Sequence, residues 1–292
     1  MSWNDIFDRY TAPLAPLPTG LSPSGKPLHL VKAVLFDVYG TLFISASGDL
    51  GGIRDEGFLS NGENNFPESR KTFETLLADF GSHLSPEKLL RAYAGAIENE
   101  HHRLKKQGRK YPEVQVDRIW KKILGFEDIT RARRFALEFE LIINPVYPMP
   151  HAGKMINKLR DADLKMGIIS NAQFYTPLLF EHFCGSRPEN MGFDANLLLY
   201  SYQLGHAKPS TLLFDIAAEK LLSYGISPEN TLFVGNDMRN DIFPAHRMGF
   251  QTALFAGDRR SLRLRKDDPG SDDIRPDLII TDLLQLPKMA GF

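Results

Sequence analysis

Residues 31–43 read VKAVLFDVYGTLF, and this stretch decides the fold. Val31 to Phe36 is almost entirely apolar and ends at Asp37 and a turn that contains Gly40. A short apolar run of this kind is typical of a parallel strand that is buried on both faces. Ligands of open parallel sheets bind beyond the carboxyl ends of the strands. The stretch therefore predicts an α/β fold with Asp37 at its ligand-binding edge.

The second half of the chain alternates between apolar runs and helical periods. Such alternation implies right-handed crossovers and a parallel, Rossmann-like sheet with helices on both faces. The predicted strands after the first are 164–169, 197–202, 231–234, 252–255 and 277–280.

Residues 44–144 have a different sequence pattern, with helical periodicity and helix-start signals such as Ser85-Pro86 and Asp128. We therefore expect an all-helical domain, 44–144, inserted after the first strand of a catalytic core formed by residues 30–43 and 145–292. Residues 1–29 are rich in Pro, Gly and Ser. We expect this extension to form neither helix nor sheet and to lie on the surface.

Composition excludes several classes of protein. The formal net charge of −1 argues against nucleic-acid binding, and three basic stretches, including 259–266, are interpreted as solvated surface. No apolar run is long enough for a membrane span, and the N-terminus does not resemble a signal peptide. A single cysteine, Cys184, fits a reducing compartment. These features predict a cytoplasmic protein, and they leave a monomer and a homodimer open.

Polar residues stand at four predicted strand ends, which a parallel sheet brings to one edge. Clustered carboxylates repel one another unless a cation lies among them, and hard oxygen ligands suit Mg²⁺. Alternative structural roles remain open, because Asp37, Ser170-Asn171 and Asp241 could each cap a turn or a helix. The candidate site residues are Asp37, Tyr39, Thr41, Ser170, Asn171, Lys208, Asn236, Asp237 and Asp241.

Four motifs in this order, FDVYGTLF, IISNA, GHAKPS and FVGNDMRNDI, resemble those of the haloacid dehalogenase superfamily of hydrolases. The resemblance covers the predicted core, and the inserted helices resemble the helical cap of that superfamily. It implies that Asp37 is a covalent nucleophile that forms an aspartyl-phosphate, with Lys208 orienting it and neutralising charge.

The resemblance also implies the roles of the other motif residues. Thr41, Ser170 and Asn171 would bind the phosphoryl group. Mg²⁺ would be held by Asp37, the backbone carbonyl of Tyr39 and an acid of the fourth motif, with Asn236, Asp237 and Asp241 as candidates.

Two positions depart from the phosphatase pattern of that superfamily. Tyr39 replaces a second Asp that protonates the leaving group, and a phenol is a poor base at neutral pH. The fourth motif reads Gly235-Asn236-Asp237, where an Asp directly after the Gly is usual. Either Asn236 or Asp237 could therefore bind the metal, and we favour Asp237 because an anion binds Mg²⁺ better than a neutral amide.

With Tyr39, the first motif resembles that of the 2-haloacid dehalogenases, which need no metal. Those enzymes hold the substrate carboxylate with an arginine of the cap, and Arg54 is the candidate for it. The acidic fourth motif argues instead for a Mg²⁺-dependent phosphatase of a small phosphate ester, which is our prediction. The alternatives are a haloacid dehalogenase and a weakly active or non-catalytic binding homologue.

Overall fold

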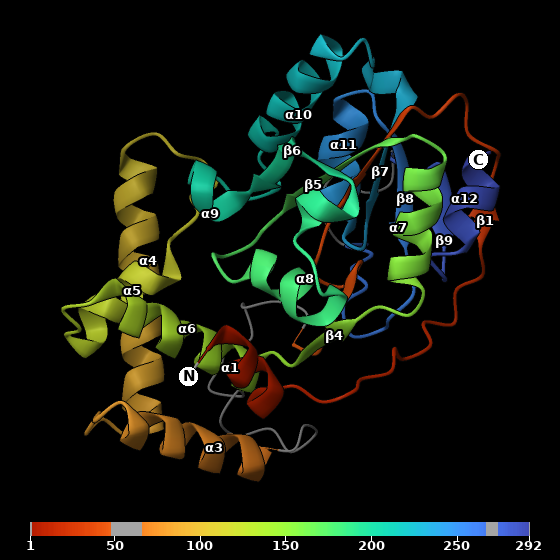
Figure 1. The fold of residues 1–292 in the computed structure, drawn as a ribbon. Helices are drawn as coiled ribbons and strands as arrows, with labels where there is room; N and C mark the ends of the chain where they lie inside the picture. The colour runs from red at the N-terminus through yellow and green to blue at the C-terminus, as the bar shows by residue number, and fades with distance from the viewer. Residues whose placement is uncertain (1, 48–65, 267–273, 292) are drawn as a thin grey trace. The chain divides into compact units, whose positions relative to one another are not determined.

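The computed structural model describes residues 2–47, 66–266 and 274–291 (Figure 1). The chain divides into two compact units, which are treated separately below. Unit 1 contains Met1–Ala12 and Asp49–Val146, and unit 2 contains Pro13–Gly48 and Tyr147–Phe292. The predicted boundaries at 43/44 and 144/145 lie close to these divisions. The assignment of the first twelve residues to unit 1 was not predicted from the sequence.

Unit 2 is built on a seven-stranded sheet in the order β1-β9-β8-β7-β2-β5-β6. All neighbouring strands are parallel except β1 and β9, which pair antiparallel. The predicted α/β fold with a parallel sheet is confirmed. The strands are β1 Ser24–Gly25, β2 Ala33–Phe36, β5 Lys165–Ser170, β6 Phe193–Tyr200, β7 Thr231–Gly235, β8 Gln251–Phe255 and β9 Leu278–Ile280.

Strand β2 lies between β5 and β7, and all four of its residues are buried. Ala33 and Leu35 join a core cluster with Phe214 and Phe233 on one face of the sheet. On the other face, Phe36 packs edge-on against Phe193 with 6.4 Å between the ring centroids. Burial on both faces explains why this strand is apolar at every position.

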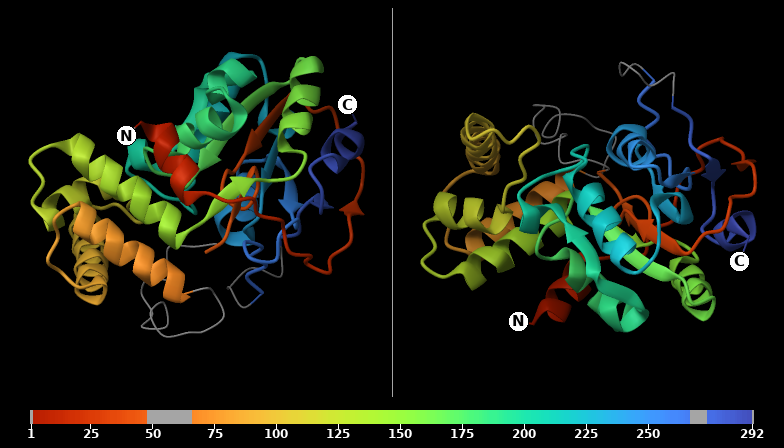
Figure 2. Two further views of the ribbon diagram at one scale, coloured as in Figure 1. Left: turned by 60° about the horizontal axis from the view of Figure 1, so that its bottom comes forward. Right: turned by 90° about the horizontal axis from the view of Figure 1, so that it is seen from above.

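Helices cover both faces of this sheet (Figure 2). Right-handed crossovers place α7 and α8 on one face and α10 and α11 on the other. The helices of unit 2 are α7 Ala152–Asp161, α8 Thr176–Cys184, α9 Ser201–Leu204, α10 Leu212–Ser223, α11 Phe243–Arg247 and α12 Gln285–Ala290. Between β7 and α11 the chain makes a π-helical turn, η4 Met238–Ile242, where the sequence predicts a regular helix over 241–248.

Unit 1 is helical in its described part, and its interior is aromatic. Trp120 stacks on Tyr93 with 4.1 Å between ring centroids, and Phe135 and Phe139 pack against Trp120 edge-on. Ser85 and Asp128 cap helices as predicted. The helices are α1 Trp3–Tyr10, α3 Phe66–Asp79, α4 Pro86–Lys106, α5 Val116–Leu124 and α6 Ile129–Ile143.

The N-terminal extension corrects one prediction, because it contains both a helix and a short strand. Ser2 and Asp5 form a reciprocal capping box at the start of α1, and Ile6 and Phe7 are buried. The helix precedes the first proline, Pro13, so the proline content of the extension has no bearing on it. Strand β1 adds the antiparallel edge to the main sheet.

A second small sheet pairs β3 Phe43–Ser45 with β4 Val146–Pro148, so the predicted helical insertion, 44–144, begins in strand, and β4 follows just after its end. The predicted Gly-rich loop at 49–58, and Arg54 within it, lie outside the described residues. Within the described ranges, none of the helices combines the length and the apolar character needed to cross a bilayer.

Candidate active site

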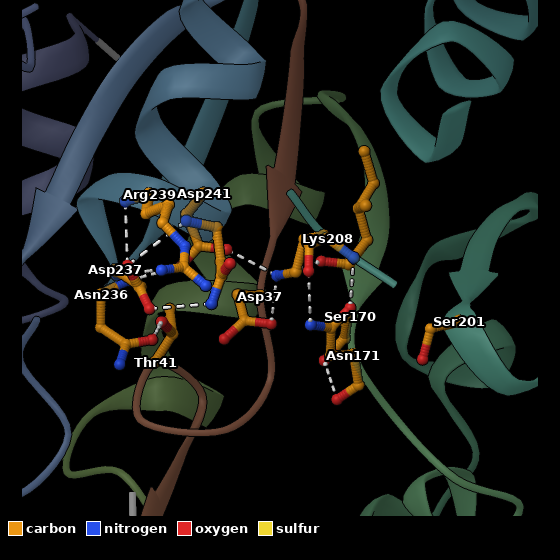
Figure 3. A network of polar contacts seen from close by, with 12 residues as sticks. Asp37, Thr41, Ser170, Asn171, Ser201, Lys208, Asn236, Asp237, Arg239 and Asp241 are labelled. Atoms are coloured by element: carbon orange, nitrogen blue, oxygen red, sulfur yellow. Dashed lines mark hydrogen bonds and ion pairs between the residues drawn. The ribbon is translucent and has the colours of Figure 1, made fainter. Parts of the chain in front are cut away.

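Asp37 directly follows β2 and is nearly buried, with 7% of its surface exposed. Its backbone N–H donates to the carbonyl of Val234 on the neighbouring strand at 2.9 Å, which extends the sheet by one residue. Its carboxylate oxygen Oδ1 accepts a hydrogen bond from Lys208 Nζ at 2.7 Å (Figure 3). Within the described part of the chain, Oδ2 of Asp37 receives no hydrogen bond, so this oxygen is open to a ligand or substrate.

Lys208 joins three strand ends through one ammonium group. Its Nζ donates to Asp37 Oδ1 at 2.7 Å, to Asp241 Oδ1 at 2.5 Å and to the carbonyl of Ile169 at 3.1 Å. These bonds use all three donors of a lysine. Burial alone would lower the pKa of Lys208, but the carboxylates of Asp241 and Asp37 outweigh it and raise that pKa. Lys208 is therefore a fixed cation beside Asp37.

Asp241 is fully enclosed and receives hydrogen bonds on both carboxylate oxygens. Oδ1 binds Lys208, and Oδ2 accepts the backbone N–H groups of Asn236 and Asp237, each at 3.0 Å. Burial raises the pKa of Asp241 to about 7, because the repulsion of Asp37 and Asp237 adds to it and Lys208 only partly opposes it. The site thus carries more negative charge than Lys208 neutralises.

The side-chain amide of Asn236 is oriented by two opposite contacts. Its Nδ2 donates to the carbonyl of Ser261 at 2.6 Å, and its Oδ1 accepts from the hydroxyl of Thr41 at 3.2 Å. Gly40 is required beside this amide, because its φ is +82° and a Cβ there would lie 2.5 Å from the Ser261 Cβ. The Oδ1 atom therefore lies on the Thr41 side of the loop.

Asp237 is occupied by contacts within its own loop and with Arg265. Its Oδ1 accepts the backbone N–H of Arg239 at 2.9 Å, and Asn240 donates to Oδ2 at 2.9 Å. The Arg265 guanidinium binds both oxygens, at 3.1 and 2.7 Å. This geometry disfavours Asp237 as a metal ligand, against the preference that charge alone suggested, because a metal would have to displace a paired guanidinium.

Ser170 and Asn171 follow β5 at the same edge of the sheet. Ser170 is fully buried, and its hydroxyl makes a long hydrogen bond of 3.3 Å to the carbonyl of Asn171. The Asn171 side chain pairs with the backbone of Lys208, with Oδ1 accepting at 2.7 Å and Nδ2 donating at 3.2 Å. Asn171 therefore holds the lysine loop, and its side chain is less suited to the phosphate contact that we predicted.

Tyr39 lies in the same loop as Asp37, and its phenol is hydrogen-bonded to the hydroxyl of Thr176 at 2.9 Å. Thr176 is the first residue of α8 and also accepts the backbone N–H of Gln173. No sequence pattern pointed to Thr176, and Arg265 lies inside the stretch 259–266 that we interpreted as solvated surface. Arg265 departs from that interpretation, since it is paired with Asp237.

A magnesium ion fits the donors at this site. Among the residues that the structure describes, no three His, Cys, Asp or Glu side chains are grouped as a metal ion would require. Mg²⁺ at phosphoryl-transfer sites, however, is held by one or two carboxylates, with water and phosphate oxygens completing its shell. The open Oδ2 of Asp37 and the amide oxygen of Asn236 are donors of this kind. Asp241, like Asp237, has both carboxylate oxygens hydrogen-bonded and would have to release Lys208 or two backbone N–H groups to bind a metal.

Comparisons of sequence and of structure with known proteins both lead to one superfamily. The family model described as haloacid dehalogenase-like hydrolase matches residues 31–249. A phosphatase of that superfamily from Thermococcus onnurineus is 18% identical, with a TM-score of 0.52 over 89% of this chain and 98% of that one. A 2-haloacid dehalogenase from Pseudomonas syringae pv. Tomato DC3000 is 19% identical, with a TM-score of 0.53 over the same shares. At these identities the two structures are similar in fold alone, and no curated protein matches the chain.

Proposed function

Because the chain belongs to the haloacid dehalogenase-like hydrolases, we propose that it is a Mg²⁺-dependent phosphatase that acts on a small phosphate ester through an aspartyl-phosphate at Asp37. The observation that carries this proposal is the bridge from Lys208 to both Asp37 and Asp241. It holds one oxygen of Asp37 and leaves the other free to attack, as a fixed carboxylate nucleophile requires.

In the first step, Oδ2 of Asp37 attacks phosphorus and the bond to the ester oxygen breaks. The Lys208 ammonium stabilises the charge that the carboxylate and the phosphoryl group bring together. Thr41 and Ser170, both fully buried, would turn their hydroxyl donors from Asn236 Oδ1 and the Asn171 carbonyl to phosphoryl oxygens. In the second step, water attacks phosphorus and the bond to Asp37 breaks, which releases phosphate and restores the carboxylate.

Mg²⁺, held by Asp37, Asn236 and the backbone carbonyl of Tyr39, would supply Lewis-acid neutralisation of the phosphoryl oxygens. The leaving oxygen has no carboxylic acid donor at position 39. The Tyr39 phenol is engaged with Thr176, so the proton comes from solvent. An ester with a good leaving group, such as a phenol, should therefore react faster than an alkyl ester.

A haloacid dehalogenase is the second candidate, because Tyr39 fits a reaction whose halide leaving group needs no proton. Arg265 also neutralises Asp237, which reduces the repulsion that such a metal-free site would suffer. A haloacid nevertheless needs a cation for its own carboxylate. At the described part of the site, Lys208 and Arg265 are already paired with carboxylates, and this favours the phosphatase.

The test compares two substrates in the same preparation. We expect hydrolysis of p-nitrophenyl phosphate that requires Mg²⁺, stops with EDTA and is lost in Asp37→Asn. Chloride release from 2-chloropropionate in the presence of EDTA would overturn the phosphatase in favour of the dehalogenase. A folded protein that performs neither reaction and binds no Mg²⁺ in a calorimetric titration would indicate the non-catalytic homologue.

A further inference from the structure

The chain passes between its two units at three places, 12/13, 48/49 and 146/147. An insertion after the first strand accounts for the second and third. The first arises because the N-terminal helix α1 belongs to the helical unit, whereas the residues that follow it belong to unit 2. The segment around Ala12 is thus an additional covalent link between the units.

Helix α1 is built into the helical unit by burial and by hydrogen bonds, and it lies alongside α6 (Figure 2). Phe7 is fully buried, and Ile6 has 1% of its surface exposed. The Tyr10 hydroxyl donates to the carboxylate of Glu138 at 3.0 Å, and Arg134 binds the other oxygen of Glu138 at 2.7 Å. Glu138 is completely buried, so α1 supplies a partner that this carboxylate needs.

The residues just after α1 are attached to unit 2 by several hydrogen bonds. Leu17 donates its N–H to Asp258 at 3.2 Å and accepts the N–H of Arg259 at 2.9 Å. The Arg260 guanidinium donates to the carbonyl of Ala15, and the Thr19 hydroxyl donates to the carbonyl of Ala256 at 2.9 Å. Between these two anchored stretches, Ala12 and Pro13 are exposed.

The attachment point in unit 2 is the segment that supports Asn236. Ser261, in the turn that begins at Asp258, holds the Asn236 amide through its carbonyl. The backbone of Arg263 pairs with the same loop. Its N–H donates to the Asn236 carbonyl at 3.0 Å, and its carbonyl accepts the N–H of Met238 at 2.9 Å. The segment 256–263 therefore contacts the N-terminal residues on one side and the fourth motif on the other.

We propose that residues 2–19 form a strap that ties the helical unit to the loop carrying Asn236 and limits how far that unit moves. The free link runs from Thr11 to Ala15 and spans at most about 14 Å when fully extended. Any displacement of the helical unit beyond this reach must either pull α1 from α6 or pull Ala15–Thr19 from the 256–263 segment. The part of the proposal that concerns turnover rests on the proposed function, whereas the restraint on motion does not.

The test lengthens the strap without removing either anchor. Inserting GGSGGS between Ala12 and Pro13 adds about 14 Å of root-mean-square reach. The matched control carries the same insertion between Leu21 and Ser22, where Thr19 and Ser24 on both sides are anchored to unit 2. A third variant places a protease site in the 12/13 insertion, so that the strap is cut after the protein has folded.

Spin labels at Ala92→Cys on α4 and Glu219→Cys on α10, both exposed positions, report the distance between the units in a Cys184→Ser background. We expect the distance distribution to broaden in the 12/13 variant, to broaden further after cleavage, and to stay unchanged in the 21/22 control. Wild-type distributions in the lengthened and cleaved proteins would overturn the proposal, as would equal broadening in the control.

Turnover of p-nitrophenyl phosphate is measured on the same proteins. We expect the ratio of kcat to KM to change in the 12/13 variant and not in the control. If the wild-type chain shows no phosphatase activity, the proposed function fails while the distance measurement still decides the strap.

Discussion

Replacing Lys208 by Met tests whether the site is held together by charge. The substitution keeps the length of the side chain and removes its ammonium group. The three side chains involved are almost inaccessible, with 2% of Lys208, 9% of Asp37 and 1% of Asp241 exposed. Solvent therefore cannot replace the lost cation, and two buried carboxylates are left facing each other.

The size of the effect follows from these contacts. Lys208 makes two hydrogen bonds to charged groups, each contributing about 1.5–3 kcal/mol. Removing one partner of a buried ion pair typically costs about 3–5 kcal/mol. We therefore expect Lys208→Met to lower the free energy of unfolding by about 3–5 kcal/mol at pH 8 in the absence of Mg²⁺.

The loss should shrink as the pH falls. A carboxyl group whose pKa is raised in the folded state destabilises the fold above that pKa, and this cost disappears as the pH falls toward the unfolded value. The pKa of Asp241 is already about 7 with Lys208 present, against 3.8 for an unperturbed aspartate, and removing the cation raises it further. The difference between Lys208→Met and wild type should therefore be smaller at pH 5 than at pH 8.

The assay is urea unfolding followed by circular dichroism and by tryptophan fluorescence. Both tryptophans, Trp3 and Trp120, belong to unit 1, so fluorescence reports that unit and dichroism reports the whole chain. Lys158→Met, at an exposed position of α7, is the control and should change stability by less than about 0.5 kcal/mol. A loss below about 1 kcal/mol at pH 8, or an equal loss at both pH values, would refute the reasoning.

Three further predictions follow from individual contacts. Gly40→Ala should cost about 2–5 kcal/mol, from a left-handed backbone plus overpacking against Ser261, whereas Gly81→Ala at φ +69° in open space should cost only about 1–2 kcal/mol; equal losses in urea unfolding would contradict the clash. Glu138→Ala should lower the fluorescence-detected stability by about 2–4 kcal/mol, because Tyr10 and Arg134 lose a buried acceptor. Its control, Glu100→Ala at the surface ion pair with Arg103, should cost less than about 0.5 kcal/mol. Similar losses of stability in Glu138→Ala and Glu100→Ala would contradict this explanation. Tyr39→Phe should change phosphatase turnover by less than about threefold, since the phenol contacts Thr176 and donates no proton in the reaction; a loss of about a hundredfold would assign it the acid role.

Much of the fold was predictable because its signals are local. The apolar run before Asp37, the caps at Ser85 and Asp128, and the alternation of strand and helix after residue 145 each depend on neighbours in sequence. The prediction failed at α1, because proline content further along the extension masked a capping box at Ser2 and Asp5. It also missed β1, since a two-residue edge strand leaves almost no pattern to read.

The sequence by itself determined that Asp37, Lys208 and Asp241 are strand-end residues of one sheet edge, because strand order in a parallel fold brings such ends together. It could not decide whether Asn236 or Asp237 binds the metal, although the negative charge of Asp237 favours that residue. Tertiary structure reverses that preference through Arg265, 28 positions away from Asp237, which pairs with its carboxylate, while Ser261 and Thr41 orient the Asn236 amide. Charge belongs to a residue and can be read from the chain, but the partner that neutralises it is chosen only when distant segments pack together.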